Sequence, residues 1–457
     1  MSVTFGVSEI DLLKPGDADY EGASAPHNRA VPQRPAFVAM AADDEDVMAA
    51  VAFARRHGLG VGVQCTGHGI TVPADGGVLV NTSRMKTVEI DEAARVARVG
   101  AGAIWSDVIP AAHRAGLAPL SGTSPTVGVV GYTLGGGIGW LARRYGYAAD
   151  SVRAAEVVTA DGFLVRASET EHADLFWALR GGTGNFGVVT ALEFDLYPVS
   201  HVYGGGLYFA IEHLHEVAGL YADRVATLPD TFTTRLAIVH VPSAPFVPEP
   251  LRGRWIAAVQ GAFIGTAGDG AEWLRPFRDV APLLADTFTV IPYTSIGTIA
   301  NEPPHPEAAV VRTEMLRHLR PELVKGLLSV AGTPESTALV AIDIRHLGGA
   351  LASRPEHASA VGHRDQGFWM NMIATFRDDA GRRQAELEMS RLVLAVQPQV
   401  TGLALPNGLN GADGAARVRT AYSPENYQRL RAVKKKYDPE NLFRFNRNIP
   451  PHEAGGR

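Results

Sequence analysis

Three glycine-rich segments hold the residue types best suited to binding chemistry. They read QCTGHG at 64–69, GTSPTVGVVGYTLGGGIG at 122–139 and RGGTGNFG at 180–187. Successive backbone N–H groups in such segments can surround an anion, and the hydroxyls of Ser124 and Thr133 add further donors. A single Gly-Gly-Gly run is more often a tight turn, but three clusters together indicate a large anionic ligand such as a dinucleotide.

The third segment contains the spacing Gly-x-Gly-x-x-Gly at Gly182, Gly184 and Gly187. In the Rossmann fold this motif follows a strand and opens a helix, so that the pyrophosphate meets the helix N-terminus. Here the residues before the motif, 174–179, are predicted to be helical, and the residues after it, 188–196, are predicted to form a strand. The order is therefore reversed, which excludes a Rossmann site, and the sequence also lacks the P-loop pattern.

Strands and helices are predicted to alternate through residues 35–198 and to place the glycine segments at strand ends. Asp43 is expected to cap a helix that shows a helical repeat of apolar residues, Val47, Ala50, Val51 and Ala54. The other expected elements are strands at 59–64, 78–80 and 96–99, helices at 103–115 and 424–437, and a hairpin across 156–165 with Asp-Gly at its turn. Residues 127–140 are expected to be loop and turn, because glycine raises the entropic cost of ordering.

Composition and charge exclude several classes of protein. The 457 residues are 46% hydrophobic and 20% charged, with a formal net charge of -6, so the positive charge of a nucleic-acid-binding protein is missing. The single cysteine excludes an intrachain disulfide and a zinc site with two thiolates, and no metal site is predicted. The sequence shows neither a signal-peptide pattern nor an apolar run of about 20 residues. We therefore expect a cytoplasmic protein without a membrane partner.

The glycine segments and the C-terminal tail together resemble the vanillyl-alcohol-oxidase-type flavoproteins with a PCMH-type FAD domain, and among them the bacterial berberine-bridge-enzyme-like oxidases. Four stretches carry the resemblance: 67–69, 127–139, 174–190, and YDPENLFRFNRNI at 437–449. The middle of the chain matches only loosely, for example at RHLGGA, 345–350.

The resemblance implies an α+β fold in three parts. Residues 1–200 would form the PCMH-type FAD-binding domain, made of two α/β subdomains. Residues 201–400 would form a substrate-binding domain with a mainly antiparallel sheet covered by helices. Residues 401–457 would form a C-terminal segment that returns to the FAD domain.

The resemblance also implies which residues contact FAD, because in such enzymes two glycine loops and the tail surround the cofactor. The cofactor-binding residues predicted in this way are Gln64, Cys65, Thr66, Gly67, His68, Gly69, Gly122, Thr123, Ser124, Val127, Gly128, Val129, Tyr132, Thr133, Gly136, Gly137, Gly187, Val188, Asn446 and Asn448. His68 matches the histidine that the family bonds to the flavin 8α-methyl. Ser124 stands where many relatives have a cysteine that makes a second bond. We therefore expect FAD held by one covalent bond, through His68.

Two departures from the family pattern affect the chemistry. Residues 64–66 replace the arginine and glycines that usually precede the histidine, and residues 405–407, Leu-Pro-Asn, replace a Tyr-x-Asn segment whose tyrosine often acts as a base. The remaining candidates for catalysis are Tyr132, His363 and Arg364. Each has a structural alternative, with Tyr132 as a ring packed against the flavin and His363 and Arg364 as a surface pair.

The sequence thus predicts an FAD-dependent oxidoreductase. We expect an oxidase that passes hydride from a small organic substrate, a secondary metabolite or a sugar-like molecule, to flavin N5, with dioxygen as the acceptor. The expected state is a monomer or homodimer without a nucleic-acid partner. Two alternatives stay open: a redox-neutral cyclase or lyase that uses FAD as a scaffold, which the missing tyrosine motivates, and a non-catalytic flavin-binding partner module.

Overall fold

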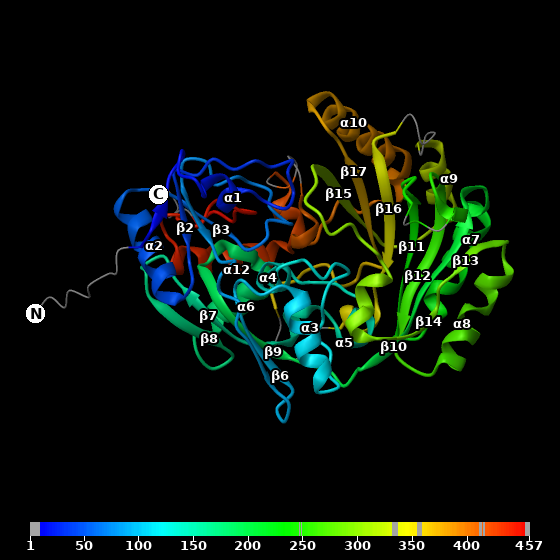
Figure 1. Ribbon diagram of the computed structural model, residues 1–457, viewed down its shortest axis with the longest axis horizontal. Helices are drawn as coiled ribbons and strands as arrows, with labels where there is room; N and C mark the ends of the chain where they lie inside the picture. The colour runs from blue at the N-terminus through cyan, green and yellow to red at the C-terminus, as the bar shows by residue number, and fades with distance from the viewer. Residues whose placement is uncertain are drawn as a thin grey trace, which may run out of the picture.

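A computed structural model describes residues 10–245, 247, 249–330, 337–353, 359–410, 414 and 416–452. Three β-sheets organise this part of the chain: two smaller sheets in one half of the molecule and an eight-stranded sheet in the other (Figure 1). Helices accompany all three sheets. The α+β class expected from the resemblance is confirmed.

The four-stranded sheet positions the first glycine segment. Its strands, in the order β1-β2-β4-β3, are β1 (Leu12–Leu13), β2 (Phe37–Met40), β4 (Val78–Asn81) and β3 (Val61–Gln64). Strands β2 and β3 both run parallel to β4, so the chain crosses over through helix α2 (Asp44–Arg56). The predicted cap is confirmed, because the Asp43 carboxylate accepts the N–H of Asp46. Strand β3 ends at Gln64, which places the segment 64–69 at the carboxyl edge of this sheet.

The five-stranded sheet is antiparallel and carries the second and third glycine segments. Its strands, in the order β5-β6-β9-β7-β8, are β5 (Val88–Asp91), β6 (Val96–Gly100), β9 (Val188–Asp195), β7 (Val152–Val158) and β8 (Leu164–Ser168). The predicted Asp-Gly hairpin is confirmed as the β7–β8 pair. Four helices belong to this part: α3 (Trp105–Arg114), α4 (Val129–Leu134), α5 (Ala142–Tyr145) and α6 (Ala173–Gly182). Helix α1 (Tyr20–Ser24) belongs instead to the four-stranded sheet, where it packs on β2.

Helix α4 lies within the glycine segment that was expected to be loop and turn throughout, so that prediction was wrong for residues 129–134. The reason is burial. Val129, Val130 and Leu134 all pack into the main hydrophobic core, and the Val129 N–H is bonded to Ala103 O at 3.0 Å. Tertiary packing therefore outweighs the local entropic cost. The segment leaves the helix where Gly136 and Gly137 adopt positive φ, at 108° and 76°.

The eight-stranded sheet is antiparallel throughout. Its strands, in the order β13-β10-β12-β11-β16-β17-β15 with β14 also paired to β10, are β13 (Leu283–Asp286), β10 (His201–Ala210), β12 (Trp255–Phe263), β11 (Phe232–His240), β16 (Leu339–His346), β17 (Phe368–Thr375), β15 (Ala309–Leu316) and β14 (Thr289–Pro292). Helices α7 (Leu214–Arg224), α8 (Ala267–Asp279), α9 (Pro321–Val330) and α10 (Asp379–Val396) cover its outer face (Figure 1). The inner face turns toward the glycine segments, and helix α5 meets this sheet at β11.

A buried arginine ties the two halves together. Arg143 of α5 donates hydrogen bonds to the carbonyls of Phe232, Leu228 and Leu347 and pairs with the Asp230 carboxylate at 3.0 Å. Because each carbonyl belongs to the region of the eight-stranded sheet, this one side chain fixes that sheet relative to the second glycine segment.

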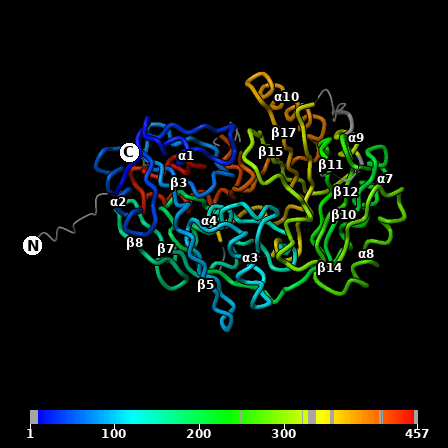
Figure 2. The backbone as a smooth tube through the Cα atoms, viewed as in Figure 1, coloured from blue at the N-terminus to red at the C-terminus, as the bar shows by residue number. Residues whose placement is uncertain are grey.

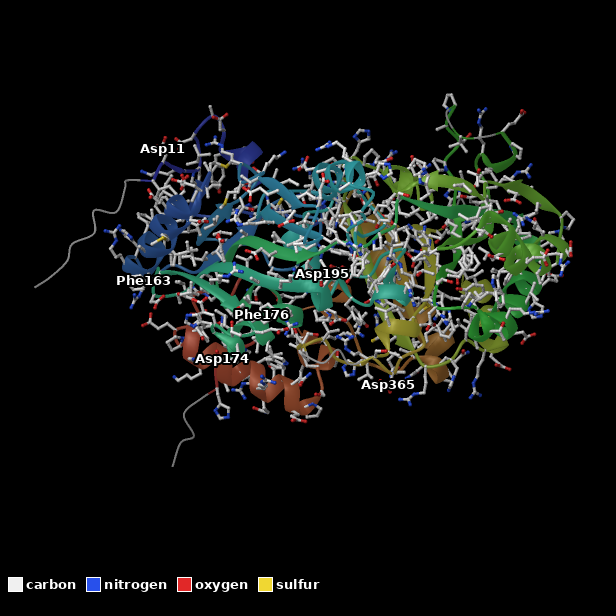
Figure 3. All side chains as sticks on the ribbon, turned by 90° about the horizontal axis from the view of Figure 1, so that it is seen from below. Asp11, Phe163, Asp174, Phe176, Asp195 and Asp365 are labelled. Carbon is white, nitrogen blue, oxygen red and sulfur yellow. The ribbon has the colours of Figure 1, made fainter. Side chains whose placement is uncertain are left out.

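The C-terminal tail returns to the N-terminal half, as the red trace among blue and teal segments shows (Figure 2). Helix α12 (Pro424–Tyr437) begins at the predicted cap, where Ser423 Oγ accepts the N–H of Asn426. Its far end is held by Asp174, labelled beside the tail helix in Figure 3, which accepts hydrogen bonds from Lys436 and Tyr437 at 2.7 and 2.9 Å.

Candidate functional site

A cavity of about 1510 Å³ separates the glycine segments from the inner face of the eight-stranded sheet. The first and second glycine segments form one wall, with Phe445, Asn446 and Arg447 of the tail. The sheet forms the opposite wall, through side chains of β10, β11, β12, β15, β16 and β17. The cavity is therefore lined by residues of both halves of the molecule.

Most of the predicted cofactor-binding residues line this cavity. They are Gln64, Cys65, Thr66, Gly67, His68, Gly69, Gly122, Thr123, Ser124, Val127, Gly128, Tyr132, Gly137, Gly187 and Asn446. The others stand behind the wall: Val129, Thr133, Gly136, Val188 and Asn448.

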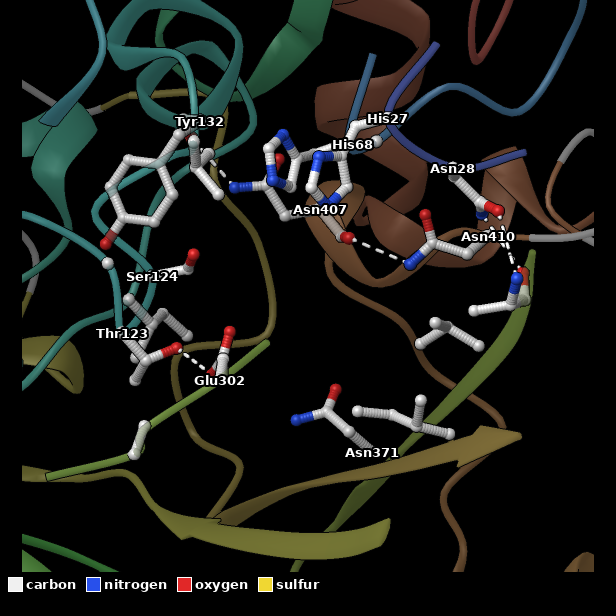
Figure 4. A pocket seen from close by; sticks show the side chains of 18 of the residues that line it. His27, Asn28, His68, Thr123, Ser124, Tyr132, Glu302, Asn371, Asn407 and Asn410 are labelled. Atoms are coloured by element: carbon white, nitrogen blue, oxygen red, sulfur yellow. Dashed lines mark hydrogen bonds between the residues drawn. The ribbon is translucent and has the colours of Figure 1, made fainter. Parts of the chain in front are cut away.

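His68 is held as a neutral imidazole in the cavity wall. Its Nδ1 lies 2.8 Å from Thr66 Oγ1 and its Nε2 lies 3.2 Å from Thr126 Oγ1, so each ring nitrogen has a hydroxyl partner. The ring stacks on that of His27 with centroids 3.6 Å apart (Figure 4). Burial, with the nearby His27, lowers the pKa of His68 to about 3. At neutral pH one ring nitrogen therefore keeps a lone pair.

The glycines are required where the wall is tight. A Cβ on Gly122 or Gly137 would stand 2.9 or 2.5 Å from the Tyr132 ring, and one on Gly128 would stand 3.1 Å from Cys65 Sγ. Side chains here would close the space between loop and cavity. At Gly131, by contrast, a Cβ would meet no atom within 4 Å, so the backbone itself forms the cavity surface.

Unpartnered polar atoms in this wall fit a bound dinucleotide cofactor. The Tyr132 hydroxyl, Asn446 Oδ1 and Asn448 Oδ1 are buried and have no hydrogen-bond partner among the described residues. Buried polar atoms are nearly always satisfied, so a ligand is expected to supply what is missing. The hydroxyls of Ser124 and Thr126 and the glycine backbone are neutral donors of the kind that suit pyrophosphate and ribityl oxygens.

The three catalytic candidates do not lie together. Tyr132 lines the cavity, and burial raises the pKa of its hydroxyl, so it stays protonated. His363 and Arg364 stand outside the cavity lining: His363 Nε2 bonds Thr420 O at 2.9 Å, and Arg364 pairs with Asp150 at 2.6 Å. The Arg364 side chain is 9% exposed, so it is also not the surface residue of the structural alternative.

Charged side chains on the sheet wall were missed by the sequence analysis. Asp343 of β16 accepts hydrogen bonds from Arg345 Nε at 3.0 Å and Asn371 Nδ2 at 2.9 Å, and lies 3.6 Å from Arg235 Nη1. Burial alone would raise the pKa of Asp343, but Arg345 and Arg235 outweigh it and hold that pKa below its usual value. The alternation of side chains along a strand predicts that Asp343 and Arg345 of β16 share one face. The sequence does not show that β11, which carries Arg235, pairs with β16. Glu302, bonded to Thr123 Oγ1 at 2.6 Å, is another carboxylate at the cavity (Figure 4).

The segment 405–407 lies at the cavity as the resemblance implies, but with apolar character. Leu405 is buried in the wall where the family has its tyrosine. Asn407 donates from Nδ2 to Tyr132 O at 2.8 Å and so holds helix α4, inside the second glycine segment. The tail is thus joined to the glycine loop without supplying a base from position 405.

Two family models match the chain. One describes an FAD binding domain and covers residues 35–168, and the other describes berberine and berberine-like proteins and covers residues 405–450. The chain thus contains an FAD binding domain and a berberine-like C-terminal segment, and its relatives are FAD-linked oxidoreductases and oxidases. Its cofactor is FAD, and the expected oxidoreductase class is confirmed.

Relatives of this oxidoreductase match over nearly the whole chain. The (R)-6-hydroxynicotine oxidase of Paenarthrobacter nicotinovorans is 28% identical over 454 residues, which is 96% of each protein. The solved 6-hydroxy-D-nicotine oxidase of Arthrobacter nicotinovorans superposes with a TM-score of 0.85 at 25% identity, covering 97% of this chain and 98% of that one. A glucooligosaccharide oxidase from Acremonium strictum, solved with 6-S-cysteinyl, 8α-N1-histidyl FAD, has the same fold, with a TM-score of 0.83 at 23% identity and 97% coverage of both chains.

Neither a metal-binding cluster nor a membrane-spanning helix occurs among the residues that the structure describes. No group of three or more His, Cys, Asp or Glu side chains there could hold a metal ion. No helix among those residues is long and apolar enough to cross a membrane.

Proposed function

We propose that this oxidoreductase is an oxidase of a small organic substrate, with dioxygen as the electron acceptor. The observation that carries the proposal is one continuous cavity that joins the glycine segments and the neutral His68 to a polar sheet face. Residues 1–200 and 401–457 would hold the cofactor, and 201–400 would hold the substrate. When bound, FAD supplies a two-electron acceptor for a substrate C–H bond.

The cofactor would be held by the two glycine segments and by the tail residues Asn446 and Arg447. Backbone N–H groups of the segments, with Ser124 and Thr126, would face the phosphate and ribityl oxygens. Asn446 Oδ1 and the Tyr132 hydroxyl, both without a protein partner, would complete their hydrogen bonds on the cofactor. Val188 and Asn448 stand behind the wall and stay among the proposed cofactor-binding residues, since Asn448 Oδ1 also has no hydrogen-bond partner among the described residues.

We further propose one covalent bond to FAD, through His68. Bond formation needs the imidazole lone pair, and the lowered pKa of His68 keeps that lone pair free at neutral pH. The glucooligosaccharide oxidase carries both a cysteinyl and a histidyl bond. Here Ser124 occupies the second position, and the Cys65 thiol, whose pKa burial raises to about 11, is a poor nucleophile at neutral pH.

Substrate oxidation would also release a proton, which a side chain of the cavity would take up. Tyr132 keeps its own proton, because burial raises its pKa, and would act as a hydrogen-bond donor. Glu302 is the carboxylate proposed to receive the proton. Asp343 is less suited, because Arg345 and Arg235 hold its pKa below the usual value and keep it ionised. The aliphatic side chains farther along the sheet favour a secondary metabolite over a sugar-like substrate.

Acid precipitation tests the covalent bond. The wild-type pellet is expected to stay yellow, and His68→Ala is expected to release its flavin into the supernatant. Thr126→Val is the matched control, since it removes a partner of the His68 ring but keeps the imidazole. A colourless wild-type pellet contradicts the covalent proposal while leaving FAD binding intact.

Reoxidation tests the oxidase proposal. Enzyme reduced with dithionite and freed of excess reductant is expected to release hydrogen peroxide equimolar with flavin on mixing with air-saturated buffer. Slow reoxidation without peroxide would point to another acceptor.

Leu405 in place of the tyrosine supports a second candidate, the redox-neutral cyclase or lyase. Anaerobic mixing with substrate separates the two, because an oxidase bleaches its flavin and a redox-neutral enzyme leaves the spectrum unchanged. A monomeric or homodimeric state and a cytoplasmic location stay part of the proposal, and light scattering and cell fractionation test them.

A further inference from the structure

The inner face of the eight-stranded sheet is ordered into rows by the strand register. One row across four strands holds Gln260, Arg235, Arg345 and Trp369, which are direct cross-strand neighbours. The next row, two residues farther along β11, holds Ala258, Ala237, Asp343 and Asn371. The third holds Ile256, Val239, Ala341 and Ile373. All of these residues line the cavity, so its sheet wall changes from cationic to aliphatic along the strands.

The cationic row lies beside the second glycine segment. The Arg235 guanidinium stands 5.5 Å from the centre of the Trp140 ring, directly after that segment. The aliphatic row begins at Val239, four residues farther along β11, which is a distance of about 13 Å in an antiparallel strand. An elongated ligand can therefore contact both rows at once.

The two arginines are an unusual pair for a sheet. Arg235 and Arg345 are directly opposite one another, and like charges in that position repel. Their side chains are only 8% and 16% exposed. Asp343 is the one carboxylate paired with both, and it reaches Arg235 only at 3.6 Å. Two buried cations against one buried anion leave one excess positive charge facing the cavity.

The donors of Arg345 are also incompletely used. Among the described residues its hydrogen bond to Asp343 involves Nε alone, which leaves both Nη atoms without a protein acceptor. Glu302 is the nearest further acid that acts electrostatically on both arginines, but it is exposed and bonded to Thr123. A planar guanidinium with free terminal donors is suited to a carboxylate.

We propose that Arg235 and Arg345 bind a carboxylate of the substrate, and that the apolar body of the same molecule lies over the row of Val239, Ile256 and Ile373. The substrate class is thus an amphipathic carboxylic acid. The inference rests on the proposed function in one respect, namely that the sheet wall of the cavity is the substrate wall.

The test uses FAD-loaded enzyme, so that the cofactor already occupies its own anion-binding groups. The probes are phenylacetate, 3-phenylpropanoate and 4-phenylbutyrate, each compared with its carboxamide. Changes in the flavin absorbance spectrum during titration give the dissociation constants. Each acid is expected to bind at least about tenfold more tightly than its amide, because hydrogen bonds to charged groups are the strong ones. Each added methylene is expected to tighten binding up to about fourfold.

Two variants test whether the preference for the acid over the amide depends on the two arginines. Arg345→Gln is expected to weaken the acids by about tenfold to a hundredfold and to leave the amides unchanged. Glu302→Gln removes a nearby negative charge and is expected to tighten the acids alone. Flavin content is measured in each preparation, so that a loss of cofactor is separated from a loss of acid binding.

Equal binding of acid and amide by the wild type overturns the inference, and so does the failure of both to bind. An Arg345→Gln enzyme with full flavin content and undiminished preference for the acid overturns it too. If Arg345→Gln does not fold, the wild-type comparison and Glu302→Gln still decide. Because the titration requires no turnover, a chain that binds acids but releases no peroxide loses the oxidase proposal only.

Discussion

Replacing Lys434 with methionine is expected to destabilise the oxidoreductase by about 3–5 kcal/mol, although Lys434 lies outside the cavity. The ammonium group is fully buried, and so is its partner Asp438, at 2.7 Å. The same Nζ donates to the carbonyls of Asn185 and Phe443, at 2.7 and 3.0 Å. The lysine therefore joins helix α12, the third glycine segment and the tail at one point.

The magnitude follows from what the substitution leaves behind. Methionine fills the space of the lysine stem, so little packing is lost. The Asp438 carboxylate stays buried and loses its cation, while two carbonyl oxygens lose their donor, each at about 1–3 kcal/mol. Backbone N–H groups of Leu442 and Phe443 still bond the carboxylate, at 2.7 and 2.9 Å. This partial compensation keeps the total near that for removing one member of a buried ion pair.

Urea unfolding of the FAD-loaded enzyme, followed by tryptophan fluorescence, measures the effect. Lys436→Met is the matched control, because Lys436 lies in the same helix and pairs with Asp174 but its side chain is 60% exposed. It is expected to cost no more than about 1 kcal/mol. The double change Lys434→Met with Asp438→Asn is expected to cost less than the sum of the single changes, since it leaves no unpaired charge. A Lys434→Met loss below about 1 kcal/mol, or equal to that of Lys436→Met, would refute the reasoning.

Three further predictions concern the cavity and its surroundings. Ser124→Cys in a His68→Ala background is expected to restore acid-stable yellow colour, as a thiol now stands at the family's second attachment position; a colourless pellet counts against that assignment. Burial lowers the pKa of His346 from 6.5 to about 3, so as the pH falls the unfolded chain takes up this proton before the folded protein does. The free energy of unfolding is therefore expected to fall between pH 6.5 and pH 3, by up to about 1.4 kcal/mol per pH unit. Denaturation curves at several pH values check this, with a shallower slope expected for His346→Gln. Gly137→Ala is expected to lower the free energy of unfolding by at least about 1–2 kcal/mol, because residue 137 has a positive φ. It is also expected to reduce flavin content, because the new Cβ would stand 2.5 Å from the Tyr132 ring. Full flavin content in this variant would contradict the role of that close approach.

The sequence predicted correctly those features that depend on residues close together in the chain. Asp43 caps its helix because a short carboxylate can reach an N–H three residues away. The segment at 122–139 lines the cavity, although it lies between helices α3 and α5 rather than at the strand end expected for it. The segment at 64–69 reaches the cavity because it follows strand β3, as expected. These are local rules, and they need no knowledge of the rest of the fold.

The features that the sequence missed depend on contacts between distant segments. Arg235 and Asp343 become neighbours only through the register of β11 with β16. Arg364 was a catalytic candidate, but the structure places its guanidinium against Asp150, outside the cavity lining. Such partners stand more than one hundred residues away in the chain, and nothing in either segment alone specifies the pairing.

The third glycine segment has a different use from the other two. A Cβ on Gly181 would meet Val361 N at 2.6 Å, and one on Gly182 would meet the Phe186 ring at 2.6 Å and Leu430 of α12 at 3.0 Å. These glycines allow close chain packing. Asn185, which they surround, is fully buried and bonds the tail from three atoms: Oδ1 to the N–H of Ile449, Nδ2 to the carbonyl of Arg447 and its own carbonyl to the Lys434 ammonium.

The reversed order of helix and strand around this segment is consistent with that use. A segment that receives the tail does not need a helix N-terminus aimed at a phosphate, and its Gly181 and Gly182 allow other segments of the chain to pack closely against it. Through Asn185 it fixes the stretch that brings Asn446 and Arg447 to the cavity wall. The excess of glycine in the N-terminal half therefore has two physical causes. One is a backbone surface at the cavity, to which Gly184 and Gly187 of the third segment also contribute. The other is close packing at Gly181 and Gly182.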